Sequence, residues 1–182
     1  MAAETDEGGA ASGGASGAVS GGASGGASGG VMELAPFRFL FRVRYGECDA
    51  QHIVFNARWG DFIDIACTEY LRALLGVAEP GEVGLHIRLV RQLIEWKEPG
   101  RFDDVIDAEV RTLKVGTTSF TLATVFRRLA DGVVLAMADT VYVAVDPVVG
   151  QKRPLTEEHR GLLESGALGR VVDHAGAVAR PG

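Results

Sequence analysis

The chain has 182 residues, of which 24 are acidic and 18 are basic, so its formal net charge is −6. This charge argues against a nucleic-acid-binding protein, because contact with phosphates requires a basic surface. Two cysteines are too few for a disulfide framework, and the four histidines lack metal-ligand spacing, so we expect no metal site. No apolar run approaches the ~18 residues that cross a membrane, which favours a cytoplasmic protein without a membrane span.

The sequence divides into a folded domain and two terminal segments. Residues 8–30 are almost entirely Gly, Ala and Ser, and such a segment has no large apolar side chains whose burial would offset the entropy lost on ordering. We therefore expect a disordered tail over residues 1–33. It lacks the basic start and apolar core of a secretory signal and the arginines of a transit peptide. The folded domain is expected over residues 34–165, followed by a flexible tail over residues 166–182.

The first predicted element is a strand over Phe37–Tyr45, where apolar and aromatic residues alternate with arginines. Alternation places the apolar side chains on one face of the strand, and that face is predicted to be buried in the core. Gly46 ends the run. The residues of the predicted buried face are Phe37, Phe39, Phe41, Val43 and Tyr45.

A long amphipathic helix is predicted over Ala57–Leu75. Its apolar residues recur at spacings of three and four, which is the period of a helix with one buried face. Asn56 is a suitable N-cap, and Gly76 is a suitable stop. The predicted buried stripe consists of Trp59, Phe62, Ile63, Ala66, Tyr70, Leu71 and Leu74.

Four more extended segments follow the helix, and Asp131-Gly132 between the last two is a strong hairpin turn. A short terminal helix is predicted over Pro154–Leu163, which has an early proline and acidic residues in its first turn. Because helices and strands are segregated along the chain, the predicted class is α+β with an antiparallel sheet. The four extended segments are Leu85–Lys97, Asp104–Leu113, Ser119–Leu129 and Val133–Val145.

The link between the first strand and the helix reads Tyr45-x-x-x-Asp49-Ala50-x-x-x-Val54-x-Asn56-Ala57-x-Trp59. This pattern, together with the order of the elements, resembles the hotdog-fold acyl-CoA thioesterases of the 4-hydroxybenzoyl-CoA thioesterase and YbgC-like type. The similarity covers about residues 37 to 160, which is nearly all of the predicted domain. Three further stretches are similar to that family, namely Thr68–Arg72, Pro99–Asp104 and Gly116–Phe120.

The resemblance implies a hotdog fold, in which a five-stranded antiparallel sheet wraps around one long central helix and a short C-terminal helix follows. It also implies a homodimer that pairs edge to edge and shares its active sites across the interface, with a homotetramer as the open alternative. The implied substrate is an acyl-CoA. Coenzyme A is then part of the substrate, and no separate cofactor is expected.

The resemblance further implies that Asp49 is the catalytic carboxylate, acting either as general base for a water or as direct nucleophile. On the residues alone, the simpler interpretation is that Asp49 caps its own loop. The first N–H groups of a helix lack acceptors within the helix and carry partial positive charge. Those of Phe55, Asn56 and Ala57, with Val54 beside them, are therefore candidates to hold the thioester oxygen.

Asn56 and His52, which lie near Asp49, each have two interpretations, and Tyr45 is a secondary candidate. Asn56 either caps the helix or donates its side-chain amide to substrate or water. His52 stands where the resembling family often has Gly, and it is either a proton donor to the leaving thiolate or a loop side chain that faces a partner subunit. Tyr45 opens the motif and is a secondary candidate for the site.

Contacts with the rest of the substrate are expected at the start of a later strand. In relatives, the positions of Thr117, Thr118 and Ser119 contact substrate, although hydroxyl side chains are equally suited to an ordinary strand. Lys114 is the one basic residue just before them, so it is a candidate for contact with the CoA phosphates. The other candidates are Arg88, Arg91, Arg127 and Arg128, which by default belong to a solvated face.

Two other functions compete with the thioesterase hypothesis. Hotdog hydratases and dehydratases share the fold but usually carry Asp and His five residues apart, whereas His52 follows Asp49 by three. A non-enzymatic acyl-CoA-binding protein would bind the same ligands without turnover. The length and aromatic character of the acyl group, and the choice between dimer and tetramer, do not follow from the sequence.

Overall fold

The computed structural model describes residues 35–177, and the predicted tail over residues 1–33 lies outside them. The strands are β1 (Phe37–Arg42), β2 (Ile87–Trp96), β3 (Val105–Val115), β4 (Ser119–Arg128), β5 (Val134–Ala144) and β6 (Val171–Asp173). The helices are α1 (Arg58–Leu75) and α2 (Glu157–Ser165), with short 3-10 turns η1 (Tyr45–Glu47) and η2 (Pro80–Val83).

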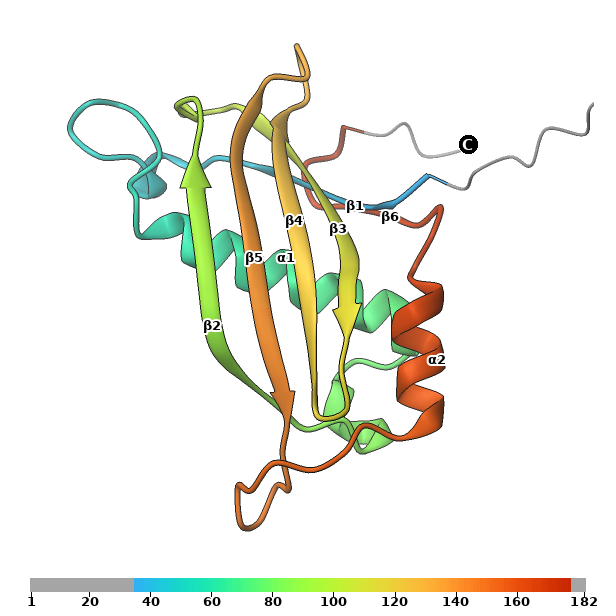
Figure 1. Ribbon diagram of the computed structural model, residues 1–182. Helices are drawn as coiled ribbons and strands as arrows, with labels where there is room; N and C mark the ends of the chain where they lie inside the picture. Colours follow the sequence, from blue (N-terminus) through green and yellow to red (C-terminus); the bar gives the residue numbers. More distant parts are fainter. Residues whose placement is uncertain (1–34, 178–182) are drawn as a thin grey trace, which may run out of the picture. The chain divides into compact units, whose positions relative to one another are not determined.

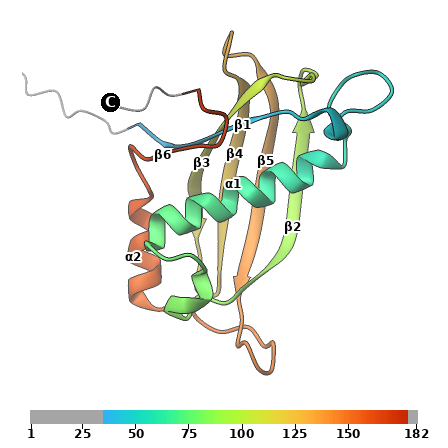
Figure 2. The ribbon, with the colours of Figure 1, turned by 180° about the vertical axis from the view of Figure 1, so that it is seen from behind.

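The six strands form one sheet in the order β2-β5-β4-β3-β1-β6. Every neighbouring pair is antiparallel except β1 and β6, which run parallel. The long helix α1 crosses one face of this sheet (Figures 1 and 2). The predicted α+β class and hotdog fold with one long helix are confirmed, whereas the sheet has a sixth, parallel strand beyond the five antiparallel strands predicted. Among residues 35–177, no helix has both the length and the apolar character that crossing a bilayer would require.

The helix packs on the sheet through the stripe that its periodicity predicts. Six of the seven predicted residues are buried, and Leu74 is half-buried. Aromatic rings dominate the contact: Phe62 lies 4.7 Å from Phe41, and Trp59 lies 5.4 Å from Phe126, between ring centroids. Such pairs add roughly 0.5–1.5 kcal/mol each beyond the burial of their area. Gly76 ends α1 as predicted, in the left-handed conformation at φ +69°.

The prediction of a flexible tail over residues 166–182 is wrong for residues 171–173, which form β6 beside β1. The N–H of His174 donates to the carbonyl of Leu40 at 2.8 Å, and its ring packs edge-on against Phe39 at 5.0 Å. Pairing with β1 supplies the hydrogen bonds that this short segment could not make alone. Its three residues between glycine-rich neighbours give no strand pattern of their own.

The first strand is shorter than predicted. β1 ends at Arg42, and Tyr45 lies in η1 with 78% of its surface exposed, so its predicted burial is wrong. The chain turns at this point because the N–H of Glu47 donates to the carbonyl of Arg44 at 3.1 Å. This turn directs the following residues away from the sheet and into the loop that carries Asp49.

Candidate active site

Asp49 lies in a tight loop between η1 and α1. Cys48 and Val54 pair as an antiparallel bridge across the base of the loop, and the N–H of Asp49 donates to the carbonyl of Ile53 at 2.9 Å. One carboxylate oxygen of Asp49 accepts the N–H of Gln51 at 2.8 Å, which is the local cap that the residues alone suggest. The other carboxylate oxygen has no hydrogen-bond partner within residues 35–177. It is therefore available to a ligand or a water.

The half-buried carboxylate borders a cleft of about 450 Å³. The rings of Tyr45 and Phe102 meet edge to face at 6.2 Å on its wall, and both are exposed, at 78% and 55%. Two exposed aromatic rings beside a carboxylate give the cleft an apolar wall and a polar group, which is typical of small-molecule sites. The lining residues are Tyr45, Gly46, Cys48, Asp49, Ala50, His52 and Phe102.

Phe102 lines the cleft, although the sequence did not mark it as a candidate. It lies between β2 and β3, where no periodic pattern tells whether an aromatic ring is buried or exposed. An aromatic residue inside a polar turn is itself an unusual signal, since turns favour Gly, Pro, Asn and Asp. That signal could have marked Phe102 as a candidate.

The same turn holds the end of the Asp49 loop. Ile53 pairs with Arg101 as an antiparallel bridge, and the N–H of Val54 donates to the carbonyl of Gly100 at 2.8 Å. The N–H of Phe55 donates to the carbonyl of Glu47 at 3.0 Å. Two of the four predicted oxyanion candidates, Val54 and Phe55, therefore use their N–H groups to fold the loop.

The N–H groups of Asn56 and Ala57 have no acceptor in the part of the chain that the structure describes. They come directly before α1, whose first N–H groups share the same partial positive charge. They are the two remaining candidates for contact with a developing oxyanion.

The prediction that Asn56 caps α1 is wrong. The N-cap residue is Ala57, which already has helical dihedral angles (φ −67°, ψ −24°), and no side chain caps the helix. An N-cap side chain works from an extended residue, whereas here the chain enters α1 through a tight turn, with the N–H of Arg58 donating to the carbonyl of Phe55 at 2.8 Å. The exposed side chain of Asn56 has no hydrogen bond within residues 35–177 and remains available to substrate or water.

His52 lines the cleft but has a strained backbone. Its φ of +60° lies in the left-handed region, which a residue with a β-carbon adopts at a cost of roughly 1–2 kcal/mol. Its exposed ring makes no hydrogen bond within residues 35–177. His52 therefore shares the cleft with Asp49 without being fixed toward it.

The predicted substrate residues Thr117, Thr118 and Ser119 lie in the β3–β4 hairpin, at the opposite end of the sheet from the Asp49 loop (Figure 1). β3 runs from one end to the other, and its 11 residues span roughly 35 Å. Carbonyls of this hairpin accept hydrogen bonds from the chain itself, with Thr117 accepting the N–H of Leu155 at 2.9 Å. One chain does not bring these residues to Asp49.

Neither cysteine is arranged as a nucleophile. Burial, followed by the charges of Glu47 and Asp49, raises the pKa of the Cys48 thiol, and burial raises the pKa of Cys67 to about 11. A thiol with a raised pKa stays protonated at neutral pH, and the thiolate is the reactive form. Neither thiol is therefore favoured as a nucleophile.

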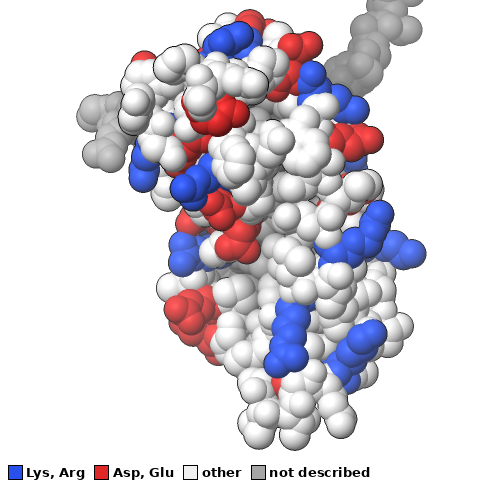
Figure 3. Space-filling view, turned by 90° about the vertical axis from the view of Figure 1, so that its left-hand side faces the viewer, with Lys and Arg blue, Asp and Glu red and all other residues white. Residues whose placement is uncertain are grey.

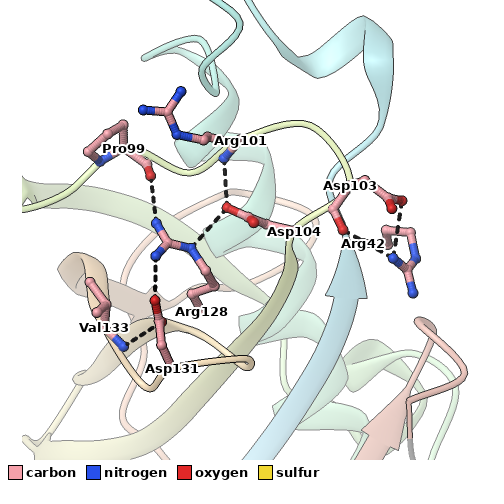
Figure 4. Close-up of polar contacts among 8 residues, drawn as sticks. All are labelled: Arg42, Pro99, Arg101, Asp103, Asp104, Arg128, Asp131 and Val133. Carbon is pink, nitrogen blue, oxygen red and sulfur yellow. Dashed lines mark hydrogen bonds and ion pairs between the residues drawn. The ribbon is translucent and has the colours of Figure 1, made fainter.

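Arg128 fixes the turn that supports the loop (Figure 4). Its guanidinium donates to Asp131 at 2.7 Å, to Asp104 at 3.2 Å and to the carbonyl of Pro99 at 3.1 Å. Hydrogen bonds to Asp131 and Asp104 raise the pKa of Arg128. With these partners Arg128 is a poor candidate for CoA phosphates. Arg88 and Arg91 are exposed and make no ion pair within residues 35–177.

Comparison with known proteins relates nearly half of the chain to one superfamily. Residues 51–135, which begin two residues after Asp49 and include α1, β2, β3, β4 and the first two residues of β5, match the thioesterase superfamily. Over this stretch the chain is similar to the thioesterase superfamily. The similarity agrees with the hotdog fold of the sheet and α1.

A curated protein and a solved structure from Aquifex aeolicus are similar to this chain over most of their own length. A curated Aquifex aeolicus (strain VF5) protein with "esterase" in its name is 26% identical over 111 residues, which are 60% of this chain and 85% of that protein. The structure of a hypothetical protein, AQ1494 from Aquifex aeolicus, is 25% identical with a TM-score of 0.64, covering 70% of this chain and 99% of that chain.

A thioesterase from Thermus thermophilus, solved with coenzyme A and Zn, has the same fold. It is 23% identical with a TM-score of 0.63, covering 74% of this chain and 96% of that chain. The zinc ion belongs to that complex. Within residues 35–177 of the present chain, no three His, Cys, Asp or Glu side chains are grouped so as to bind a metal.

Proposed function

We propose that the protein is an acyl-CoA thioesterase, which hydrolyses an acyl-CoA to a carboxylic acid and coenzyme A. One observation carries this proposal. Within residues 35–177, one carboxylate oxygen of Asp49 has no partner and borders an aromatic-walled cleft, and the same loop leads directly to the N–H groups of Asn56 and Ala57, which have no acceptor in that range. A carboxylate and an oxyanion-binding pair are the two elements that acyl transfer needs.

In the proposed reaction, water is added across the C–S bond of the thioester. Asp49 either takes a proton from a water that attacks the carbonyl carbon, or attacks that carbon itself and forms a mixed anhydride that water then hydrolyses. In both routes negative charge develops on the carbonyl oxygen and the CoA thiolate leaves and accepts a proton. Each N–H that contacts the oxyanion contributes roughly 2.7–4 kcal/mol to the transition state.

A homodimer that pairs along β2 completes the proposed site. β2 is an edge strand of ten residues, and it exposes the large apolar side chains of Leu89, Val90, Leu93 and Trp96. Figure 3 faces this edge and shows broad uncharged areas, with basic side chains toward the lower end and a mixture of acidic and basic side chains toward the upper end. Long apolar edges are normally covered by another chain.

The position of the β3–β4 hairpin also supports the dimer. Thr117, Thr118 and Ser119 lie far from Asp49 in their own chain, so they reach an Asp49 cleft only if it belongs to a second subunit. The acyl-CoA would then lie between the two chains.

The test is thiol release by the purified protein from a panel of acyl-CoAs that vary in chain length and aromatic character. We expect Asp49→Asn and Asp49→Ala to lower kcat/KM by roughly 100- to 10,000-fold, the range for a catalytic acid or base. Circular dichroism and the Tm should stay close to wild type, because the Asp49 carboxylate makes one hydrogen bond within its own loop.

Three outcomes would contradict the proposal. Full activity of Asp49→Ala would exclude the mechanism. Hydration of an unsaturated acyl-CoA without thiol release would indicate a hydratase. Binding of several acyl-CoAs by calorimetry without turnover of any would indicate a binding protein.

A further inference from the structure

We propose that Arg128 and Asp104 are positioning residues for Asp49, acting through the turn between β2 and β3. This inference rests on the proposed function, because it assigns a catalytic consequence to contacts outside the cleft. Neither side chain lines the cleft. Their effect must therefore pass through the backbone of the turn over residues 99–104.

This turn contributes twice to the site. The carbonyl of Gly100 accepts the N–H of Val54 at 2.8 Å and so holds the end of the Asp49 loop. Two residues later, Phe102 forms part of the aromatic wall. A shift of the turn would therefore move both the loop that carries the carboxylate and the surface against which a substrate would lie.

Arg128 and Asp104 fix the two peptide groups on either side of Gly100. The carbonyl of Pro99 accepts a hydrogen bond from Arg128 at 3.1 Å, and the N–H of Arg101 donates to Asp104 at 2.8 Å. The same oxygen of Asp104 accepts the Nε–H of Arg128 at 3.2 Å, which joins the turn to β4 (Figure 4).

Close packing leaves the turn little freedom to adjust by itself. A β-carbon on Gly100 would lie 3.1 Å from a methyl group of Val54, which is tighter than ordinary van der Waals contact. Gly100 and Val54 are both buried. Arg128 is hydrogen-bonded to the turn, and the turn is hydrogen-bonded to Val54 at the base of the Asp49 loop. Because the turn and Val54 are closely packed, a shift of one should move the other.

The ion pair is shielded enough to hold this geometry. The side chains of Arg128 and Asp104 are 22% and 19% exposed, so solvent screens their attraction less than that of a surface pair. Arg128 also separates Asp104 from Asp131, and an uncharged replacement would leave these two carboxylates without their shared cation. The turn would then be expected to relax away from β4.

A second ion pair in the sheet offers a matched control. Arg38 donates to both carboxylate oxygens of Asp107, at 2.9 and 3.1 Å through Nε, and the two side chains are 34% and 13% exposed. This pair joins β1 to β3 and makes no hydrogen bond with the Asp49 loop or with the turn over residues 99–104. Its loss should lower stability without moving the site.

The experiment compares Arg128→Met and Asp104→Asn with Arg38→Met and Asp107→Asn in the full chain. Assays with the best acyl-CoA of the panel are run at saturation and well below each Tm. We expect Arg128→Met to lower kcat at least tenfold with KM within threefold of wild type, while the control variants keep kcat within twofold. Arg128→Lys should recover part of the loss, because one ammonium cannot replace all three guanidinium contacts.

Hydrogen exchange of the Val54 amide gives a readout that does not depend on turnover. We expect protection of this amide to fall at least tenfold in Arg128→Met and to stay near wild type in Arg38→Met, relative to each variant's global stability. If Arg128→Met does not fold, Arg128→Lys and Asp104→Asn answer the same question.

The proposal is overturned if Arg128→Met keeps kcat and Val54 protection near wild type, or if Arg38→Met loses both to the same extent. A wild-type protein that hydrolyses no acyl-CoA would instead reject the proposed function. If Val54 protection were also unchanged in Arg128→Met, the structural link from Arg128 to the Asp49 loop would be rejected as well. If protection were lost, the link would exist, but its proposed catalytic role would be rejected.

Discussion

At the scale of single residues, the backbone of the Asp49 loop determines which N–H groups are available to a ligand. Val54 and Phe55 use their N–H groups to fold the loop, whereas Asn56 and Ala57 keep theirs unpaired within residues 35–177. His52 sits at the point where the loop reverses, with φ +60°. The strain at His52 and the geometry of Asp49 thus belong to one five-residue segment.

We expect His52→Gly to stabilise the protein by up to about 1 kcal/mol, because relief of left-handed strain outweighs the extra freedom of an unfolded glycine. The kcat should stay within threefold, since the His52 ring makes no hydrogen bond within residues 35–177. Urea denaturation measures the free energy of unfolding. His52→Ala is the matched control, because it removes the ring but keeps the β-carbon; equal gains in both variants would contradict the strain argument.

At the scale of elements, the packing of α1 on the sheet followed from its periodicity, because one apolar stripe of 3.6-residue period can face only one surface. The start of α1 did not follow. Asn56 has the right chemistry for a cap, but the tertiary bond from Val54 to Gly100 sets the direction in which the chain approaches the helix. Local propensity cannot predict a direction that a residue far along the chain imposes.

The same limit explains the other differences between expectation and structure. Alternation continues through Tyr45, yet the turn at Arg44 takes that ring out of the core. β6 has three residues and takes its hydrogen bonds from β1, which is distant in sequence. Asp49 could be singled out because its motif is local, while Phe102 reaches the cleft only through the fold.

The buried thiol under α1 predicts a loss of stability in alkaline solution. Burial raises the pKa of Cys67 from 9.0 to about 11, so the unfolded chain releases this proton first. The contribution of Cys67 to stability is fully present below about pH 9 and falls by about 1.4 kcal/mol per pH unit between about pH 9 and 11. Denaturation at a series of pH values measures this slope.

Cys67→Ala is the control for the alkaline loss. The variant should start from a lower stability, because it leaves a small cavity, but its slope should be flatter between about pH 9 and 10. Above that range Tyr70 and Tyr142, whose pKa values burial also raises, add their own losses. An unchanged slope in this range would show that Cys67 is not the group responsible.

At the scale of the whole molecule, the edge at β2 determines the proposed assembly. We expect wild type to sediment as a dimer or a tetramer and Val90→Lys, alone or with Leu89→Lys, to sediment as a monomer with activity reduced at least tenfold. A charge on the exposed apolar edge opposes pairing, and a monomer cannot bring Thr117–Ser119 to an Asp49 cleft. Sedimentation velocity and thiol release measure the two effects together.

Leu168→Lys is the control for the assembly prediction. Leu168 is as exposed as the residues of the β2 edge, but it lies between α2 and β6, near the other edge of the sheet. This variant should keep both the assembly and the activity. A fully active Val90→Lys monomer would show that one chain contains the whole site.

The three residues of β6 have a consequence for how far assembly can proceed. Two edges are available to any open sheet, and a chain with two uncovered edges can add copies without end. β6 pairs with β1, so the exposed edge on that side of the sheet has only three residues. A symmetric pair formed through β2 would cover the long β2 edge of both copies. With the β2 edges paired and β1 covered by β6, assembly by strand pairing would stop at two copies instead of continuing into a fibre.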